Sequence, residues 1–198
     1  MFFEVEKKFI LNEKQREKLL EGAEFLSEKK FTDTYFDNDE FSLGLSDMWL
    51  GKRDKQFSLK IPVREKKEDL INKYHEIEGE LTIREIFAIP IVNDFEKDLK
   101  SFGHKSFCTF QTALKKYTKE GFIIDLDEAN FGDWQYELAK IKLLVKSENQ
   151  MKDAEEKIRE FASRFGLEVK HVNGELIEFI KREIPEIYER LKKEKIAY

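Results

Sequence analysis

Polar and apolar residues alternate over the first ten positions of the chain. Successive side chains of a β-strand point to opposite faces of its sheet, so Glu4, Glu6 and Lys8 would share one face, with Val5 and Phe9 on the other. The alternation predicts a strand whose apolar side packs on helices and whose charged side lines an interior. A strand at the start of an ordinary sheet, with a solvated charged face, gives the same pattern.

Seven later segments have the composition of strands, and segments with helical spacing lie between them. The expected strands are residues 31–37, 49–53, 56–60, 74–78, 106–117, 121–126 and 135–145. The expected helices are residues 12–30, 82–86, 94–102, 149–165, 176–181 and 185–193. Residues 64–69 form an expected solvated loop, and residues 127–132 an expected turn. This order predicts an α+β fold built on an eight-stranded antiparallel β-barrel with flanking helices.

Composition narrows the class of protein. The 198 residues are 40% apolar, enough for one packed domain spanning residues 1–198. Charged residues make up 39% of the chain at a net charge of only −5, and their interleaved signs argue against a nucleic-acid partner. The single cysteine, Cys108, excludes a disulfide framework, and no stretch has the length of a membrane span. We expect a cytoplasmic protein without a membrane partner, and a monomer and a homodimer both remain open.

Charged residues on the expected strands carry both signs. The positions concerned are Glu4, Glu6, Lys8, Arg53, Lys60, Glu76, Glu78, Asp125, Asp127 and Glu137. Because buried charges must be paired or ligated, an interior of this kind needs a ligand that satisfies both signs. A polyphosphate bound to Mg²⁺ or Mn²⁺ meets that need: carboxylates hold the metal, and lysine or arginine holds the phosphate oxygens.

Several motifs occur in an order that resembles the CYTH superfamily, the triphosphate tunnel metalloenzymes. The motifs are Glu4-x-Glu6-x-Lys8, Asp33-Thr34-Tyr35-Phe36-Asp37, Trp49-Leu50-x-Lys52-Arg53, Leu59-Lys60, Tyr74-x-Glu76, and Asp125-Leu126-Asp127 followed by Phe131-Gly132 and Glu137. Within the superfamily the chain most resembles thiamine triphosphatases, over nearly its whole length. The resemblance implies a single triphosphate tunnel domain that binds a small triphosphate with one or two divalent metals. Members either hydrolyse the triphosphate or, in class IV adenylyl cyclases, cyclise ATP.

The same resemblance implies roles for individual residues. The implied ligands of Mg²⁺ or Mn²⁺ are Glu4, Glu6, Asp125 and Glu137. The implied substrate-binding residues are Lys8, Trp49, Arg53, Lys60 and Lys116, with a core or rim aromatic as the alternative role of Trp49. Lys8 would lie against the terminal phosphate as a catalytic residue. An attacking water needs only weak general-base help, for which Glu76 or Glu78 is available.

Four positions depart from the family pattern. Gly51, Leu114, Ala139 and Glu175 stand where Arg, Arg, Glu and Lys are usual. These changes predict a less positive cavity, one metal rather than two, and weaker triphosphate binding. Bases that could supply the missing charge are Lys115, Lys116, Lys170 and Lys181.

Three functions follow from the motifs and their departures. The first is a metal-dependent hydrolase of a small triphosphate, either thiamine triphosphate or inorganic triphosphate. The second is a partly degenerate protein that binds a triphosphate or another polyanion without catalysis. The third is a class IV adenylyl cyclase, although no adenine pocket is identified. The sequence does not select the group attached to the triphosphate.

Overall fold

A computed structural model describes residues 3–62 and 74–197 of the chain. The charged segment 64–69, expected as a loop, lies outside the described residues. Eight strands form one sheet in the order β1-β8-β7-β6-β2-β3-β4-β5. Their bounds are β1 Phe3–Phe9, β2 Glu24–Asp37, β3 Trp49–Arg53, β4 Gln56–Pro62, β5 Tyr74–Glu78, β6 Lys105–Lys119, β7 Phe122–Asn130 and β8 Gln135–Val145. The expected α+β class and eight-stranded antiparallel sheet are confirmed.

Six α-helices connect and follow these strands in the described residues. They are α1 Glu13–Leu20, α2 Glu80–Phe87, α3 Phe95–Ser101, α4 Met151–Arg164, α5 Glu175–Glu183 and α6 Pro185–Lys193, with short 3₁₀ turns η1 Gly44–Ser46 and η2 Glu148–Gln150. None of these helices is both long enough and apolar enough to span a bilayer.

The chain forms two compact units. The first unit contains residues up to Lys30 together with Thr112–Glu175, and the second contains Phe31–Gln111 together with Leu176–Tyr198. Strands β2 and β6 each contribute residues to both units. The prediction of one domain over residues 1–198 stays a prediction.

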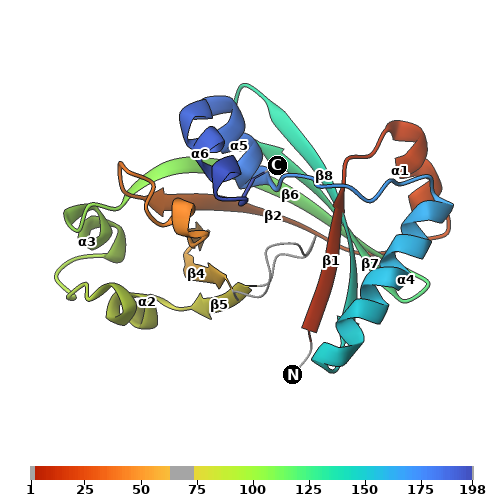
Figure 1. Cartoon of the computed structure of the whole chain (residues 1–198), viewed down its shortest axis with the longest axis horizontal. Helices are drawn as coiled ribbons and strands as arrows, with labels where there is room; N and C mark the ends of the chain where they lie inside the picture. Colours follow the sequence, from red (N-terminus) through yellow and green to blue (C-terminus); the bar gives the residue numbers. More distant parts are fainter. Residues whose placement is uncertain (1–2, 63–73, 198) are drawn as a thin grey trace. The chain divides into compact units, whose positions relative to one another are not determined.

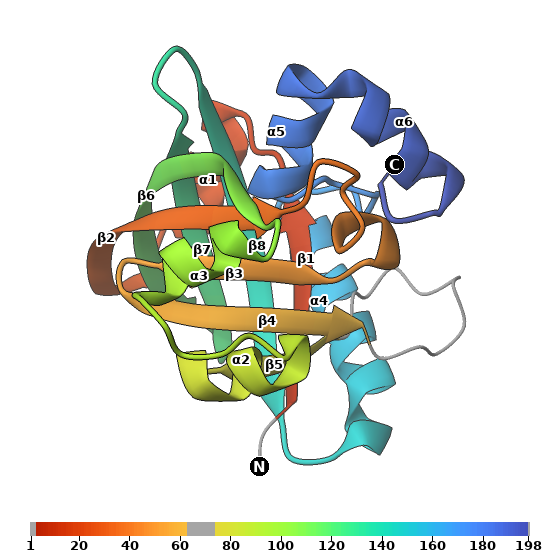
Figure 2. The same cartoon turned by 90° about the vertical axis from the view of Figure 1, so that its left-hand side faces the viewer.

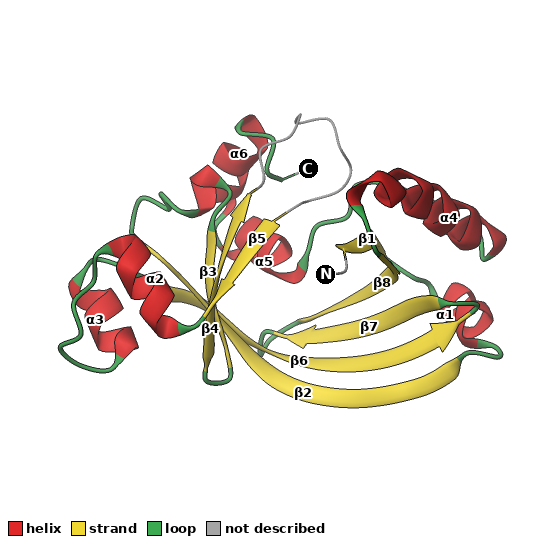
Figure 3. Cartoon of the chain, turned by 90° about the horizontal axis from the view of Figure 1, so that it is seen from below, coloured by secondary structure: helices red, strands yellow, loops and turns green. Residues whose placement is uncertain are grey.

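In the first unit, β1, β8 and β7 lie side by side and α4 lies along β1 and β8 (Figures 1 and 3). The apolar stripe of α4 has helical spacing, with Met151, Ala154, Ile158 and Phe161 buried. It covers the strand face that carries Val5, as the alternation predicts. Each fully buried aliphatic side chain of this layer contributes about 1.5–3 kcal/mol to folding.

A buried lysine of β1 lies on the face that α4 covers. Lys7 is 5% exposed, and its Nζ lies 2.8 Å from Glu155 Oε1 of α4. The pair ties β1 to α4 inside an otherwise apolar layer.

The second unit is organised around the hairpin of β3 and β4, with β5 beside β4 (Figure 2). One face of these strands packs on α2 and α3 in a buried cluster of Phe36, Leu43, Leu50, Phe57, Leu59, Ile83, Ile89, Phe95 and Leu99. Beneath the cluster, Arg84 and Asp98 are both buried, and Arg84 Nη1 donates to Asp98 Oδ2 at 2.9 Å. The opposite strand face therefore remains for polar residues.

The prediction of a helix over residues 12–30 is wrong beyond Leu20. Asn12 caps α1 as expected, in a reciprocal capping box with Gln15. The helix ends at Leu20, and Gly22 then adopts a φ of 71°, in the left-handed region that favours glycine. Strand β2 begins at Glu24. The ring of Phe25 packs edge-on against the ring of Tyr117 of β6, with the ring centroids 5.5 Å apart. The contact of β2 with β6, which a local sequence pattern does not show, outweighs the helical spacing of residues 21–30.

The expected turn over residues 127–132 is also misplaced, because β7 continues to Asn130. Asp127 is buried in the strand and paired with a lysine of β8, so it cannot lie in an exposed turn. The turn is formed instead by Phe131 to Trp134, in which the Asn130 side chain accepts from Gly132 N and the φ of Gly132 is 96°. The remaining strands and helices lie within a few residues of their predicted bounds.

Candidate functional site

The register of the first unit gathers charged side chains on one face. Residues directly opposite each other in an antiparallel pair share a face. Glu6 is opposite Lys142, Lys8 is opposite Lys140, and Lys140 is opposite Asp125. The predicted residues Glu4, Glu6, Lys8 and Asp125 therefore share a face, here named the charged face of the first unit.

Lys142 occupies the middle of this face. Its Nζ lies 3.0 Å from Glu6 Oε2, 3.1 Å from Glu4 Oε1 and 3.2 Å from Asp125 Oδ2. An ammonium group has three N–H donors, so three carboxylates saturate it. Burial alone would lower the pKa of Lys142, but Glu6, Glu4 and Asp125 outweigh burial and raise the pKa. Burial alone would raise the pKa of Glu6, but Lys8 and then Lys142 outweigh burial and hold the pKa below its usual value.

Lys140 forms a second cluster two residues along β8, on the same face. Its Nζ lies 2.5 Å from Asp127 Oδ2 and 2.9 Å from Glu175 Oε1. The Tyr136 hydroxyl donates to the carbonyl of Asn173 at 2.9 Å, which holds the segment leading to Glu175 against β8. Glu175, the position where the family usually has lysine, is thus neutralised by a lysine on β8. The supply of the missing positive charge by Lys170 or Lys181 stays a prediction.

The Lys140 cluster separates the pKa values of its two carboxylates. Burial raises the pKa of Asp127 to about 6, more strongly than Lys140 lowers it. For Glu175 the balance is reversed: burial is outweighed by Lys140 and the pKa is lowered to about 2. Burial would lower the pKa of Lys140 itself, but both carboxylates raise it.

Two further lysines are held more loosely on the charged face. Lys8 Nζ is 3.5 Å from Glu6 Oε1, and Lys116 Nζ is 3.0 Å from Asp125 Oδ1. Their side chains are 28% and 32% exposed, against 13% for Lys142. Lys116 has the same strand parity as Leu114, so it brings charge to this face without a register shift. Lys8 and Lys116 are the cations of this face that an incoming anion reaches most easily.

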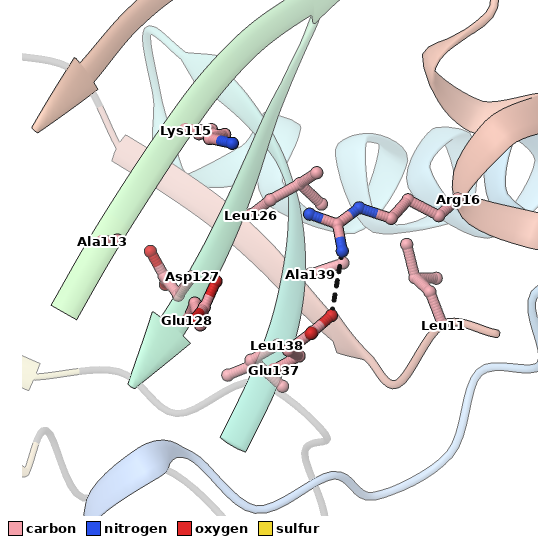
Figure 4. Close-up of a pocket in the computed structure, with 10 residues that line it drawn as sticks. All are labelled: Leu11, Arg16, Ala113, Lys115, Leu126, Asp127, Glu128, Glu137, Leu138 and Ala139. Carbon is pink, nitrogen blue, oxygen red and sulfur yellow. Dashed lines mark hydrogen bonds and ion pairs between the residues drawn. The ribbon is translucent and has the colours of Figure 1, made fainter. Parts of the chain in front are cut away.

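Glu137, a predicted metal ligand, lies on the opposite face of β8. It is opposite Glu128 in the sheet and pairs with Arg16, whose Nη1 lies 2.9 Å from Glu137 Oε2 (Figure 4). The structure therefore does not bring Glu137 together with Glu6 and Asp125. The physical reason is parity: Glu6 is opposite Lys142, so only the even-numbered residues of β8 reach the charged face.

Ala139 shares the parity of Glu137, is buried, and is opposite Phe9. Its side chain does not face the charged cluster, so the expected loss of a metal ligand at Ala139 does not describe this molecule. The small pocket beside Glu137 is bordered by Arg16, Lys115 and Glu128 (Figure 4). Its volume of about 30 Å³ has room for water but not for a triphosphate.

The second unit presents its own charged face. Trp49 is opposite Lys60, and Lys60 is opposite Glu76. Glu78 follows two residues after Glu76, and Arg53 lies on the same face by alternation. The structure thus places all five predicted residues of this unit on the face away from its apolar cluster: Trp49, Arg53, Lys60, Glu76 and Glu78.

Charges on this second face are more open to solvent. Lys60 Nζ and Glu76 Oε1 are 4.0 Å apart, with side chains 43% and 47% exposed. Arg53 holds Asp33 through two hydrogen bonds of 2.8 and 3.1 Å, and its guanidinium lies 3.9 Å from the centre of the Phe31 ring. The Arg53 side chain is still 58% exposed.

Trp49 is buried in the second unit, and its indole N–H donates to Asp47 Oδ1 at 3.0 Å. Its burial and this hydrogen bond match the alternative role of Trp49, that of a core or rim aromatic. Gly51 is a departure with a steric cause: a Cβ there would lie 3.2 Å from Cε1 of Tyr35. The tyrosine ring would have to shift by a few tenths of an ångström to admit any side chain at position 51.

Lys140 and Lys142 are functional candidates that sequence reasoning missed. Their Lys-x-Lys alternation on the expected strand 135–145 was an available signal. The motif Glu137-Leu138-Ala139 favoured the odd-numbered residues of this strand as the ones that face the site. Only the pairing with β1 reveals which parity faces the charges.

Carboxylates of the first unit are the expected ligands of the divalent metal that the family implies. Within residues 3–62 and 74–197, no three His, Cys, Asp or Glu side chains are grouped so as to hold a metal ion. The expected donors Glu4, Glu6 and Asp125 surround the ammonium of Lys142 instead. As arranged, these donors do not fit Mg²⁺ or Mn²⁺.

Residues 3–173 match the model of the CYTH domain family, and the chain therefore belongs to that family. It is 28% identical to the human thiamine-triphosphatase over 206 residues, which cover 95% of this chain and 88% of that protein. The thiamine-triphosphatase of Macaca fascicularis is similar at the same identity and coverage. These relatives support a role in triphosphate binding or hydrolysis.

Solved structures share the fold at lower identity. The PH1819 protein of Pyrococcus horikoshii OT3 has a TM-score of 0.65 at 20% identity, covering 91% of this chain and 100% of that chain. HpAC1 from Hippeastrum, reported to have a dominant triphosphatase activity, has a TM-score of 0.55 at 14% identity, covering 91% and 95% of the two chains. At these identities the likeness concerns the fold alone.

Proposed function

We propose that this chain binds a small triphosphate, thiamine triphosphate or inorganic triphosphate, and hydrolyses one of its phosphoanhydride bonds. The observation that carries the proposal is the pair of partly exposed lysines, Lys8 and Lys116, on either side of the fixed Lys142 cluster. Membership of the CYTH family and similarity to thiamine-triphosphatase over 95% of the chain support the choice of substrate.

In this proposal basic residues neutralise the phosphate oxygens. Lys8 acts on the terminal phosphate, and Lys116 supplies a further charge-assisted contact on the same face. The family resemblance assigns phosphate contacts to Arg53 and Lys60 as well. Neutralising the leaving diphosphate lowers the barrier to attack by water. Glu76 or Glu78 is the proposed weak general base, since both carboxylates are exposed on β5. No step is assigned to a divalent metal, because the available donors are paired with lysine.

A second candidate is a triphosphate-binding protein without hydrolytic activity. It is favoured by one observation: Glu4, Glu6, Asp125, Asp127 and Glu175 are all paired with lysine ammonium groups. A face neutralised in this way retains charge for binding but has few carboxylates free to act on water.

Phosphate release separates the two candidates. The full chain would be incubated with thiamine triphosphate, inorganic triphosphate and ATP, each with Mg²⁺, with Mn²⁺ and with EDTA, while calorimetry measures binding. Release supports the hydrolase, and binding without release supports the second candidate. Formation of cyclic AMP from ATP would identify a cyclase, and absence of both binding and turnover would overturn the proposal.

A matched pair of variants locates the site. Lys116 and Lys115 are neighbours on β6 with opposite parity, and Lys115 borders the small outer pocket. We expect Lys116→Gln to weaken triphosphate binding about 10-fold or more, the loss of one charge-assisted contact. Lys115→Gln should leave binding unchanged. Equal effects would place the substrate elsewhere.

A further inference from the structure

We propose that Lys142 is a built-in cation that takes the place of a divalent metal ion on the charged face of the first unit. The inference deepens the proposed function, on which it rests: the phosphate chain would be held by ammonium groups without a bound metal. It concerns a residue that family motifs did not single out. Its evidence is the arrangement of three carboxylates around one Nζ atom.

Backbone pairing fixes the position of this ammonium. Lys142 projects from β8, which is hydrogen-bonded to β1 on one side and β7 on the other. Glu6 lies directly opposite it on β1, and Asp125 lies on β7 two residues from Ile123, the register partner of Lys142. The side chain thus emerges between the two strands that carry the expected metal ligands. Its side chain is 13% exposed, so solvent does not replace the carboxylates.

The contacts match those of an ammonium and exclude a metal at the same point. The three N–O separations lie between 3.0 and 3.2 Å, whereas Mg²⁺ binds oxygen at about 2.0–2.1 Å. A divalent ion among these oxygens would also lie within a few ångströms of the positive Nζ, where like charges repel strongly. Metal and ammonium are therefore alternatives.

Charge balance gives the same result. The three carboxylates Glu4, Glu6 and Asp125 are matched by the ammonium groups of Lys142, Lys8 and Lys116. A neutral set has no excess negative charge to attract a divalent ion. Lys142 is buried among the carboxylates, which leaves the more exposed Lys8 and Lys116 for phosphate.

The deciding experiment is Mn²⁺ binding to the full chain, measured by calorimetry and by the electron paramagnetic resonance of free Mn²⁺. Wild type should show no saturable binding below about millimolar Mn²⁺. Lys142→Gln removes the cation and leaves three carboxylates together, so its Mn²⁺ affinity should exceed that of wild type by about 100-fold or more. Lys142→Arg keeps the charge and should resemble wild type.

Two results would overturn the inference: tight Mn²⁺ binding by wild type, or a folded Lys142→Gln protein that gains no affinity. If Lys142→Gln does not fold, the Mn²⁺ titration of the wild-type protein alone decides whether the inference stands. Binding of inorganic triphosphate that is unchanged by EDTA supports the inference, and binding that requires Mn²⁺ refutes it. Failure of the proposed function is recognised separately, because a protein that binds no triphosphate at all still gives a result in the Mn²⁺ titration.

Discussion

The two units carry the same kinds of charged residue on their strands but hold them in different ways. In the first unit, Lys140 and Lys142 are 17% and 13% exposed and each contacts two or three carboxylates. In the second, Lys60 and Arg53 are 43% and 58% exposed, and Lys60 Nζ lies 4.0 Å from Glu76 Oε1. Lys140 and Lys142 are held by carboxylates inside the fold, whereas Lys60 and Arg53 are open to solvent.

This difference determines what a substitution measures. Removing one member of a buried ion pair leaves an uncompensated charge, which destabilises the folded state strongly. Removing one member of an exposed pair changes stability little, because water replaces the partner. We therefore expect substitutions of buried lysines in the first unit to lower stability most. Substitutions of exposed bases in the second unit should remove a charge with little change in stability.

The largest expected effect is that of Lys140→Met. It would leave Asp127 and Glu175 buried without their cation, and should reduce the free energy of unfolding by about 3–5 kcal/mol at pH 7. Urea unfolding followed by circular dichroism measures it. Lys60→Met on the second unit is the matched control, with an expected loss of about 1 kcal/mol or less. Equal losses would show that the two faces do not differ in this respect.

The next effect is a pH dependence that resides in Asp127. Its folded-state pKa is about 6 against an ordinary 3.8. Between these values the folded state keeps a proton that the unfolded state has lost, so stability contributed by this group falls as pH rises through the window. The fall reaches at most about 3 kcal/mol.

Asp127→Asn should abolish this fall. The difference in unfolding free energy between the variant and wild type should shift in favour of the variant from pH 4 to pH 7. Glu175 acts in the opposite sense and at lower pH, since its pKa is lowered to about 2. Urea unfolding of both proteins at a series of pH values from 4 to 7 measures the difference, from which the contribution of Glu175 cancels. Parallel profiles of the two proteins would contradict the raised pKa.

A smaller effect is expected for Gly51→Arg, which restores the residue usual in the family. The sequence alone favours tighter triphosphate binding by this variant. The structure predicts a loss of stability of about 1–3 kcal/mol, because the new side chain must displace the Tyr35 ring. Adding Tyr35→Ala should make Gly51→Arg cost less than in the wild-type background. Thermal unfolding of the four proteins in the cycle tests this, and strict additivity would exclude the steric cause.

The smallest effect on stability, with a clear effect on binding, is expected for Lys60→Met. Its unfolding free energy should stay within about 1 kcal/mol of wild type. Its affinity for inorganic triphosphate should fall about 10-fold, the loss of one charge-assisted contact. Calorimetry measures the affinity. Unchanged affinity would show that Lys60 does not contact the triphosphate.

How far the sequence could be interpreted depended on the range of the interactions involved. The Asn12 cap, the hairpin of β3 and β4 and the bounds of β8 are local features, and all were predicted. The parity of Glu4, Glu6 and Lys8 on β1 is local too. The parity of β8 is not, because it depends on pairing with β1, and a one-residue change of register exchanges the faces of a strand. That is why Glu137 was placed on the wrong face and Lys142 was overlooked.

The pairing of Lys7 with Glu155 on the far side of β1 has a consequence for folding fidelity. Lysines 140 and 142 lie on the charged side of β8, and the apolar side carries Ile141. If β8 slipped by one residue against β1, both ammonium groups would enter the layer beneath α4, where Lys7 already uses Glu155. Misregistered chains would carry two unmatched cations in an apolar layer, a heavy penalty. Lys140 and Lys142 thus disfavour any alignment of β8 with β1 that is shifted by one residue.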